Sequence, residues 1–177
     1  MNVVVITGSP HANGTSAYLA DQFMKGAKEA GHTVHRFDAG LETVYPCFGC
    51  DHCRTSGTCI HKDGIGKLLP DLLEAQVVVF VTPLFYFNMS AQLKMVIDRF
   101  YAINHQLVGD KKQALLLATA YDNNDWTFQT LTTHYQTLLR YLGWIDAGRL
   151  LAGGCGIRSD IEGSSFGEQA YQMGKGL

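Results

Sequence analysis

Four of the chain's five cysteines lie close together, in the pattern Cys47-x2-Cys50-x2-Cys53-x5-Cys59. The first two spacings match the bacterial ferredoxin run that ligates an iron–sulfur cluster, although the last spacing is longer and Ile60 replaces the usual proline. Four thiolates also suit a structural zinc ion, but zinc sites commonly separate two cysteine pairs by a longer stretch. The segment therefore predicts a [4Fe–4S] cluster or free thiols about equally, and zinc less strongly.

A second segment with binding chemistry is the sequence TGSPHANGTS at residues 7–16, between an apolar run and an amphipathic stretch. Where a buried strand turns into a helix, backbone N–H groups converge on anions and the helix dipole favours negative charge. Ser9, Thr15 and Ser16 add hydroxyl groups, and Asn13 adds an amide. The segment lacks the lysine of the P-loop and the glycine spacing of the dinucleotide fingerprint. As a whole it predicts a site for a phosphate monoester such as that of FMN, whereas each residue alone favours an ordinary capped helix.

Two further loops follow apolar runs later in the chain. Pro83 ends one run and is followed by Leu84 and three aromatic residues, Phe85, Tyr86 and Phe87. Exposed aromatic side chains in such a loop indicate a flat ligand or a protein partner. The next run ends in Thr119-Ala120-Tyr121, which is expected to reach the edge of the same ligand. Asn124 or Asp125 is better explained as the N-cap of the following helix.

Hydrophobic periodicity predicts the elements that position these loops. Short apolar runs predict buried parallel strands at residues 3–7, 33–37, 77–82, 114–119 and 147–152. Apolar residues at helical spacing predict helices after residue 16 and across residues 65–72, 93–100 and 128–142. Pro70 is expected to kink or divide the second of these helices. Ser165 and Glu168 are expected to form a capping box for a last helix.

This repeated β-α alternation predicts an α/β fold, a flavodoxin-like three-layer sandwich with a five-stranded parallel sheet of order 2-1-3-4-5. In this topology ligands bind beyond the carboxyl ends of strands 1 and 3, where the strand order reverses. The loops at residues 7–16 and 83–87 are expected to meet there. The length of 177 residues fits a single domain over residues 1–177, with a cysteine-rich loop at residues 45–62.

Charge and hydropathy argue against several classes of partner. The formal net charge is -2, and no basic stretch is long enough to follow a nucleic-acid backbone. The chain shows no charged leader and no apolar segment long enough for a bilayer. Neither nucleic acid nor a membrane is therefore expected as a partner, and a cytoplasmic location is expected by default.

These motifs together resemble the NADPH-dependent FMN reductase family of the flavodoxin superfamily, in the branch that includes the iron–sulfur flavoproteins. The resemblance covers nearly the whole chain. It rests on the loop GSPHANGTS, on residues 82–87, on Gln92-Leu93-Lys94 and Ile97-Asp98-Arg99, and on residues 141–144 and 153–155. The compact cysteine motif resembles that of the iron–sulfur flavoproteins.

The resemblance implies roles for particular residues. Ser9, Asn13, Thr15 and Ser16 would hold the FMN phosphate, beside His11, which stands where the family often carries Arg or Lys. Residues 83–87 would contact the ribityl chain and the isoalloxazine, and residues 119–121 would lie near the ring. Cys47, Cys50, Cys53 and Cys59 would be the cluster ligands.

The expected function is FMN-dependent oxidation of NAD(P)H coupled to reduction of a small acceptor such as a quinone or a flavin. No side chain is expected to act as a catalytic acid or base, because FMN carries the redox chemistry itself. The alternative is an iron–sulfur flavoprotein that carries electrons between protein partners. The nearly neutral net charge disfavours this alternative, because flavodoxin-type carriers are usually strongly acidic. Apolar and aromatic loops at the cofactor edge predict a homodimer or a tetramer.

Overall fold

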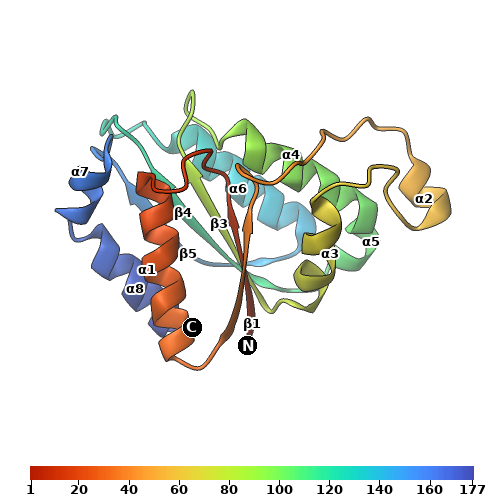
Figure 1. The fold of residues 1–177 in the computed structure, drawn as a ribbon, viewed down its shortest axis with the longest axis horizontal. Helices are drawn as coiled ribbons and strands as arrows, with labels where there is room; N and C mark the ends of the chain where they lie inside the picture. The colour runs from red at the N-terminus through yellow and green to blue at the C-terminus, as the bar shows by residue number, and fades with distance from the viewer.

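The computed structural model describes residues 1–177, and its centre is a parallel sheet of five strands. The strands are β1 (Asn2–Thr7), β2 (Thr33–Asp38), β3 (Val77–Pro83), β4 (Gln113–Thr119) and β5 (Ile145–Ala152). Their order is β2-β1-β3-β4-β5, and all neighbouring pairs are parallel (Figure 1). The predicted strands and the predicted order are confirmed, with β5 beginning two residues earlier than expected.

Helices cover both faces of the sheet, which confirms the three-layer sandwich. On one face lie α1 (Thr15–Glu29), α7 (Arg158–Glu162) and α8 (Phe166–Lys175). On the other lie α3 (Ile65–Glu74), α4 (Ala91–Arg99), the 3-10 turn η1 (Phe100–Ile103), α5 (Asn104–Leu107) and α6 (Gln129–Leu142). The remaining helix, α2 (His52–Ser56), lies in the cysteine-rich segment and projects away from the sheet (Figure 1).

The pattern of burial explains why these runs form interior strands. β1, β3 and β4 are buried along nearly their whole length, and their side chains alternate between the two hydrophobic clusters. In β1, for example, Val3 and Val5 face α1, while Val4 and Ile6 face α3 and α4. A strand buried on both faces has no polar side, which accounts for the continuous apolar runs in the sequence.

Two capping expectations were wrong, and Pro70 does not divide its helix. Pro70 lies inside an undivided α3, at a position where its missing N–H removes one helical bond without ending the helix. Ser165 adopts helical backbone angles and makes no capping bond; its hydroxyl accepts from Gln169. Neither Asn124 nor Asp125 caps α6, because the turn before it is organised by Asp122 and the helix begins at residue 129.

No helix combines the length and apolar character needed to cross a bilayer.

Candidate functional site

The carboxyl ends of β1 and β3 open onto a hollow of about 660 Å³. The loop between β1 and α1 forms most of its wall, and Pro83 and Phe85 close it from the end of β3. The structure thus brings together seven of the residues predicted from the sequence: Ser9, His11, Asn13, Thr15, Ser16, Pro83 and Phe85. This is the switch point of the sheet, the position at which the topology places ligands.

Free backbone donors line this hollow at the start of α1. Gly14 precedes the helix in an extended conformation, and no side chain caps the helix. The N–H groups of Asn13, Thr15, Ser16 and Ala17 donate to no acceptor in the protein. Unpaired N–H groups at the start of a 15-residue helix carry partial positive charge, so they favour an anion in the hollow.

Ser9 lines the hollow, but its side chain mainly stabilises the turn of the loop. Its side chain is nearly buried, and its hydroxyl contacts both the N–H and the carbonyl of His11, at 3.1 and 3.2 Å. The loop is also closely packed from the end of β2, since a Cβ on Gly40 would lie 2.0 Å from the Ser9 carbonyl oxygen. The hydroxyl predicted as a phosphate donor therefore helps to hold the turn that aims the backbone amides.

Hydrogen bonds connect this loop to the ends of β3 and β4. The Thr15 and Thr119 hydroxyls lie 2.8 Å apart. The Ser90 hydroxyl donates to the Gly8 carbonyl at 2.7 Å, and the Ser90 N–H donates to Thr82 at 2.9 Å. Segments more than 80 residues apart in the sequence therefore form one rigid edge.

The loop after β3 is a tight hairpin, and its three aromatic residues are all exposed. Phe85 and Asn88 exchange backbone hydrogen bonds of 2.9 and 3.2 Å, so Tyr86 and Phe87 form a two-residue turn. Both have positive φ, 46° and 63°, a conformation that costs roughly 1–2 kcal/mol for each non-glycine residue. Phe87 packs against Trp126, with ring centroids 5.0 Å apart, whereas Tyr86 is 99% exposed. Neither residue lines the hollow.

The other predicted loop residues lie beside the hollow. Leu84 packs against the core, and its N–H donates to the Thr119 carbonyl at 2.8 Å. Thr119 and Ala120 are buried, and Tyr121 is largely exposed. The Tyr121 ring lies so close to Gly156 that a Cβ there would be 2.4 Å from it, which explains the glycine.

Residues 156–158 also line the hollow, and sequence reasoning missed them. Gly156 and Ile157 follow β5, and Arg158 begins α7. The Arg158 guanidinium lies over the Tyr18 ring, 4.7 Å from its centroid, and contacts the Asn13 carbonyl at 3.4 Å. The only sequence signal was a lone arginine after the last strand.

The cysteine loop lies outside this hollow. Cys47 and Cys50 are exposed, Cys53 and Cys59 are half-buried, and all four are free thiols. Burial raises the pKa of the Cys53 thiol, and the charges of the other three thiols raise it further. The chemistry of the donor set suits a metal cluster, but no three metal-ligating side chains converge in this structure. Cys155 is buried, as expected.

A buried ion pair closes the base of the cysteine loop. Arg99 donates to Asp63 at 2.8 and 3.3 Å and to the Tyr45 carbonyl at 2.8 Å, while Asp63 also accepts from the Tyr45 N–H. Both charged side chains are 1% exposed. Burial alone would raise the pKa of Asp63, but Arg99 and two backbone N–H groups hold it below its ordinary value. Burial alone would lower the pKa of Arg99, but Asp63 and Cys59 raise it.

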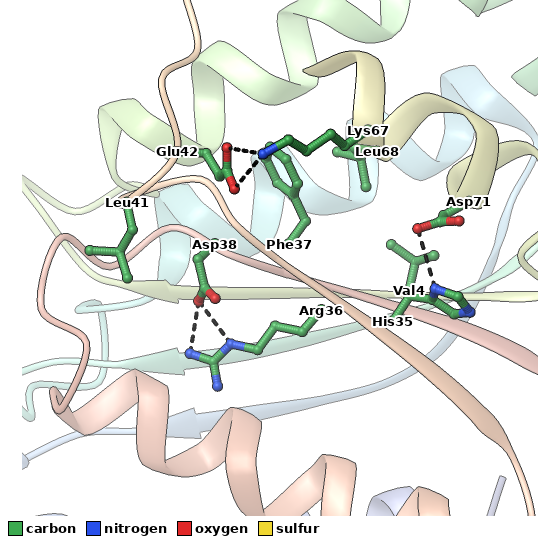
Figure 2. A pocket seen from close by; sticks show the side chains of 10 residues that line it. All are labelled: Val4, His35, Arg36, Phe37, Asp38, Leu41, Glu42, Lys67, Leu68 and Asp71. Carbon is green, nitrogen blue, oxygen red and sulfur yellow. Dashed lines mark hydrogen bonds and ion pairs between the residues drawn. The ribbon is translucent and has the colours of Figure 1, made fainter. Parts of the chain in front are cut away.

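A separate hollow of about 350 Å³ lies between β2 and α3 (Figure 2). Three ion pairs line it: His35 with Asp71, Arg36 with Asp38, and Lys67 with Glu42 (Figure 2). Three carboxylates but only two lysine or arginine side chains line this hollow, so it offers no excess positive charge to a phosphate.

Comparisons with known proteins agree with the geometry. The sequence profile of the family described as NADPH-dependent FMN reductase matches residues 1–152. An iron–sulfur flavoprotein of Archaeoglobus fulgidus is 29% identical over 106 residues, which cover 60% of this chain and 48% of that protein. One of Methanocaldococcus jannaschii is 34% identical over 104 residues, covering 58% and 52%. The chain spans about half the length of these relatives.

Solved structures show the same fold at low identity. An FMN-dependent NADH-azoreductase of Bacillus anthracis, in complex with FMN, superposes with a TM-score of 0.75 at 17% identity, covering 99% of this chain and 98% of that one. An NAD(P)H:quinone oxidoreductase of Methanothermobacter marburgensis gives 0.75 at 18% identity, covering 99% and 94%. Because the family match covers most of its length, this chain belongs to the NADPH-dependent FMN reductase family.

Proposed function

We propose that this protein is an FMN-dependent oxidoreductase that oxidises NAD(P)H and reduces a small acceptor such as a quinone or a flavin. The observation that carries the proposal is the row of unpaired N–H groups at the start of α1, which faces a hollow closed by Pro83 and Phe85. These groups suit a phosphate monoester, and the adjoining apolar wall suits a flat ring. Family membership supports the same cofactor.

The chain's own residues would bind and orient this cofactor. The amides of Asn13, Thr15 and Ser16 would hold the phosphate, Pro83 and Phe85 would contact the ribityl and ring portion, and residues 119–121 would border the ring. Bound FMN supplies hydride and electron transfer. The protein's part is therefore orientation and exclusion of water, which explains why the hollow contains no paired carboxylates and no nucleophile with its base.

A proline substitution tests the role of the backbone amides. Thr15 is the first residue of α1, where proline is well tolerated, and Gly14 already has the extended backbone that proline requires before it. Thr15→Pro removes the N–H and the hydroxyl, whereas Thr15→Ala removes the hydroxyl alone. We expect Thr15→Pro to bind FMN about tenfold to 100-fold more weakly than Thr15→Ala, from one lost charge-assisted hydrogen bond. Equal affinities would place the phosphate elsewhere.

Steady-state kinetics test the proposed activity. We expect the FMN-loaded protein to oxidise NADH or NADPH continuously when a quinone or free flavin is present. A loaded protein that accepts electrons from neither nucleotide would contradict the oxidoreductase and favour a carrier.

The cysteine loop supports a second candidate function, an iron–sulfur flavoprotein that exchanges electrons with a redox protein partner. Four thiols on one loop are the donor set of a [4Fe–4S] cluster, and several relatives bear the name iron–sulfur flavoprotein. The thiols would have to move closer together than in this structure. We expect anaerobic iron and sulfide reconstitution to load a cluster with an EPR signal that Cys50→Ser abolishes and Cys155→Ser preserves. Uptake of zinc in place of iron would contradict this second candidate and leave an FMN oxidoreductase whose cysteine loop holds a structural metal.

We also propose that the protein assembles as a homodimer or a tetramer. Tyr86 and Tyr121 are 99% and 86% exposed, and Trp126 is half exposed, all near the cofactor edge. Aromatic side chains in such positions are typical of protein interfaces. Light scattering of the FMN-loaded protein at micromolar concentration should give at least twice the chain mass, and a monomer would contradict the proposal.

A further inference from the structure

The hollow at the start of α1 needs positive charge to bind a phosphate, and the loop that forms most of its wall does not supply it. Residues 7–16 contain no lysine or arginine, although a bound phosphate monoester carries close to two negative charges at neutral pH. Among all residues that line the hollow, Arg158 is the sole lysine or arginine, and none is acidic. It comes from α7, more than 140 residues further along the chain.

Neighbouring groups hold Arg158 in place at the hollow. Its guanidinium stacks on Tyr18 of α1 at 4.7 Å, and its Nε donates to Glu162 at 2.6 Å. Asp160 accepts from the N–H groups of Gly156 and Ile157, at 2.9 and 3.0 Å, which fixes the turn that leads into α7. The side chain is 36% exposed, so it lies at the rim of the hollow rather than in free solvent.

Arg158 has hydrogen-bond donors to spare. A guanidinium carries five N–H donors. Glu162 uses the one on Nε, and the Asn13 carbonyl, at 3.4 Å, receives one from Nη1. The remaining Nη donors have no acceptor in the protein, and Asn13 is the residue whose own N–H is free for an anion.

We propose that Arg158 is a phosphate-binding residue that supplies, from the far end of the chain, the positive charge missing from the loop at residues 7–16. This inference rests on the proposed function, and it adds a side chain that, with the amides of α1, would make the site prefer FMN to riboflavin. Tyr18 and Glu162 position the guanidinium, and its free Nη donors face the phosphate beside the amides of α1. A phosphate monoester is the ligand class, because a planar fork of donors matches phosphate oxygens.

The test compares the dissociation constants of FMN and riboflavin, which differ by the phosphate alone. Arg158→Met keeps the aliphatic stem over Tyr18 and removes the charge, and Arg140→Met, at an exposed arginine of α6, is the matched control. We expect Arg158→Met to weaken FMN binding about tenfold to 100-fold at low salt and to leave riboflavin binding unchanged. Arg140→Met should change neither constant, and Glu162→Gln, which keeps the arginine, should bind FMN at least as tightly as the parent.

Several outcomes would overturn the proposal. Equal weakening of both ligands would mean that Arg158 supports the fold of the hollow and does not contact the phosphate. Unchanged FMN binding would exclude it from the site. If the parent protein bound neither flavin, the proposed function would fail. Inorganic phosphate would then test Arg158 alone, because thermal stabilisation by phosphate should be present in the parent and lost in Arg158→Met, and equal stabilisation of both would reject the assignment.

Discussion

The proposed phosphate loop at residues 7–16 and the cysteine loop at residues 45–62 are built in opposite ways. The first is short, runs directly from β1 into α1, and is connected by side-chain hydrogen bonds to β4 and to the start of α4. The second exposes most of its residues and is fixed chiefly at its base, by Arg99 and Asp63. The first therefore presents its donors before any ligand arrives, whereas the second holds its ends together and leaves its thiols apart.

Breaking the base of the cysteine loop should give the largest effect on stability. Arg99→Met leaves Asp63 as a buried charge without its partner, so we expect the free energy of unfolding to fall by about 3–5 kcal/mol. Arg140→Met, at an exposed arginine, should change it by less than about 0.5 kcal/mol. Urea unfolding measures both. A loss below about 1 kcal/mol for Arg99→Met, in the range of surface ion pairs, would show that the base is held by something else.

Acid should weaken the same pair. The folded state lowers the pKa of Asp63, so the pair stabilises the fold above the ordinary carboxyl pKa of about 3.9, and this stabilisation is lost as the pH falls through the folded value. Urea midpoints measured from pH 7 to pH 3 should therefore fall more steeply for the parent than for Arg99→Met, in which the cause of the shift is gone. Parallel curves would contradict the role of Arg99.

Overpacking the phosphate loop should lower the free energy of unfolding less than Arg99→Met does, but it should also weaken FMN binding. A Cβ at Gly40 would clash with the Ser9 carbonyl, so we expect Gly40→Ala to destabilise the fold by about 1–3 kcal/mol and to weaken FMN binding. Gly66→Ala is the control, since its Cβ would meet nothing in α3 and alanine favours a helix by roughly 0.5–1 kcal/mol. Unaltered FMN affinity in Gly40→Ala would mean that the shape of the loop does not matter to the ligand.

The smallest expected effect is the loss of one hydrogen bond between the phosphate loop and β4. Thr119→Val keeps the side-chain shape and removes the hydroxyl that contacts Thr15, so stability should fall by about 0.5–1.5 kcal/mol. Thr130→Val, at an exposed site of α6, should stay close to the parent. If thermal denaturation shows the same small change in both variants, the contact between the two loops contributes nothing.

The contrast between the two loops also explains what the sequence could predict. Continuous apolar runs such as residues 77–82 predicted buried strands, and five repeated β-α units suited the order 2-1-3-4-5 that the structure has. The topology then placed the loops of β1 and β3 at one edge, where Pro83 and Phe85 meet the start of α1. These features depend on periodicity and chain order, which are visible in one dimension.

Features that depend on distant pairs were not predictable. Nothing near Arg158 in the sequence indicates that α7 packs beside the loop of Asn13, 145 residues away. The pairing of Arg99 with Asp63 spans 36 residues in the same way. The left-handed turn at Tyr86 contradicts local preference, because aromatic residues avoid positive φ, and the paired backbone hydrogen bonds of Phe85 and Asn88 hold it there.

Hydrogen–deuterium exchange with and without FMN tests the location of the cofactor site most directly. The amides of residues 13 and 15–17 have no acceptor in the protein, so they should exchange rapidly without ligand and slow when the phosphate accepts from them. We predict slowing in peptides that cover residues 9–18, with residues 47–59 unchanged. Slowing confined to residues 35–42 and 67–71, around the hollow in Figure 2, would contradict the assignment of the site.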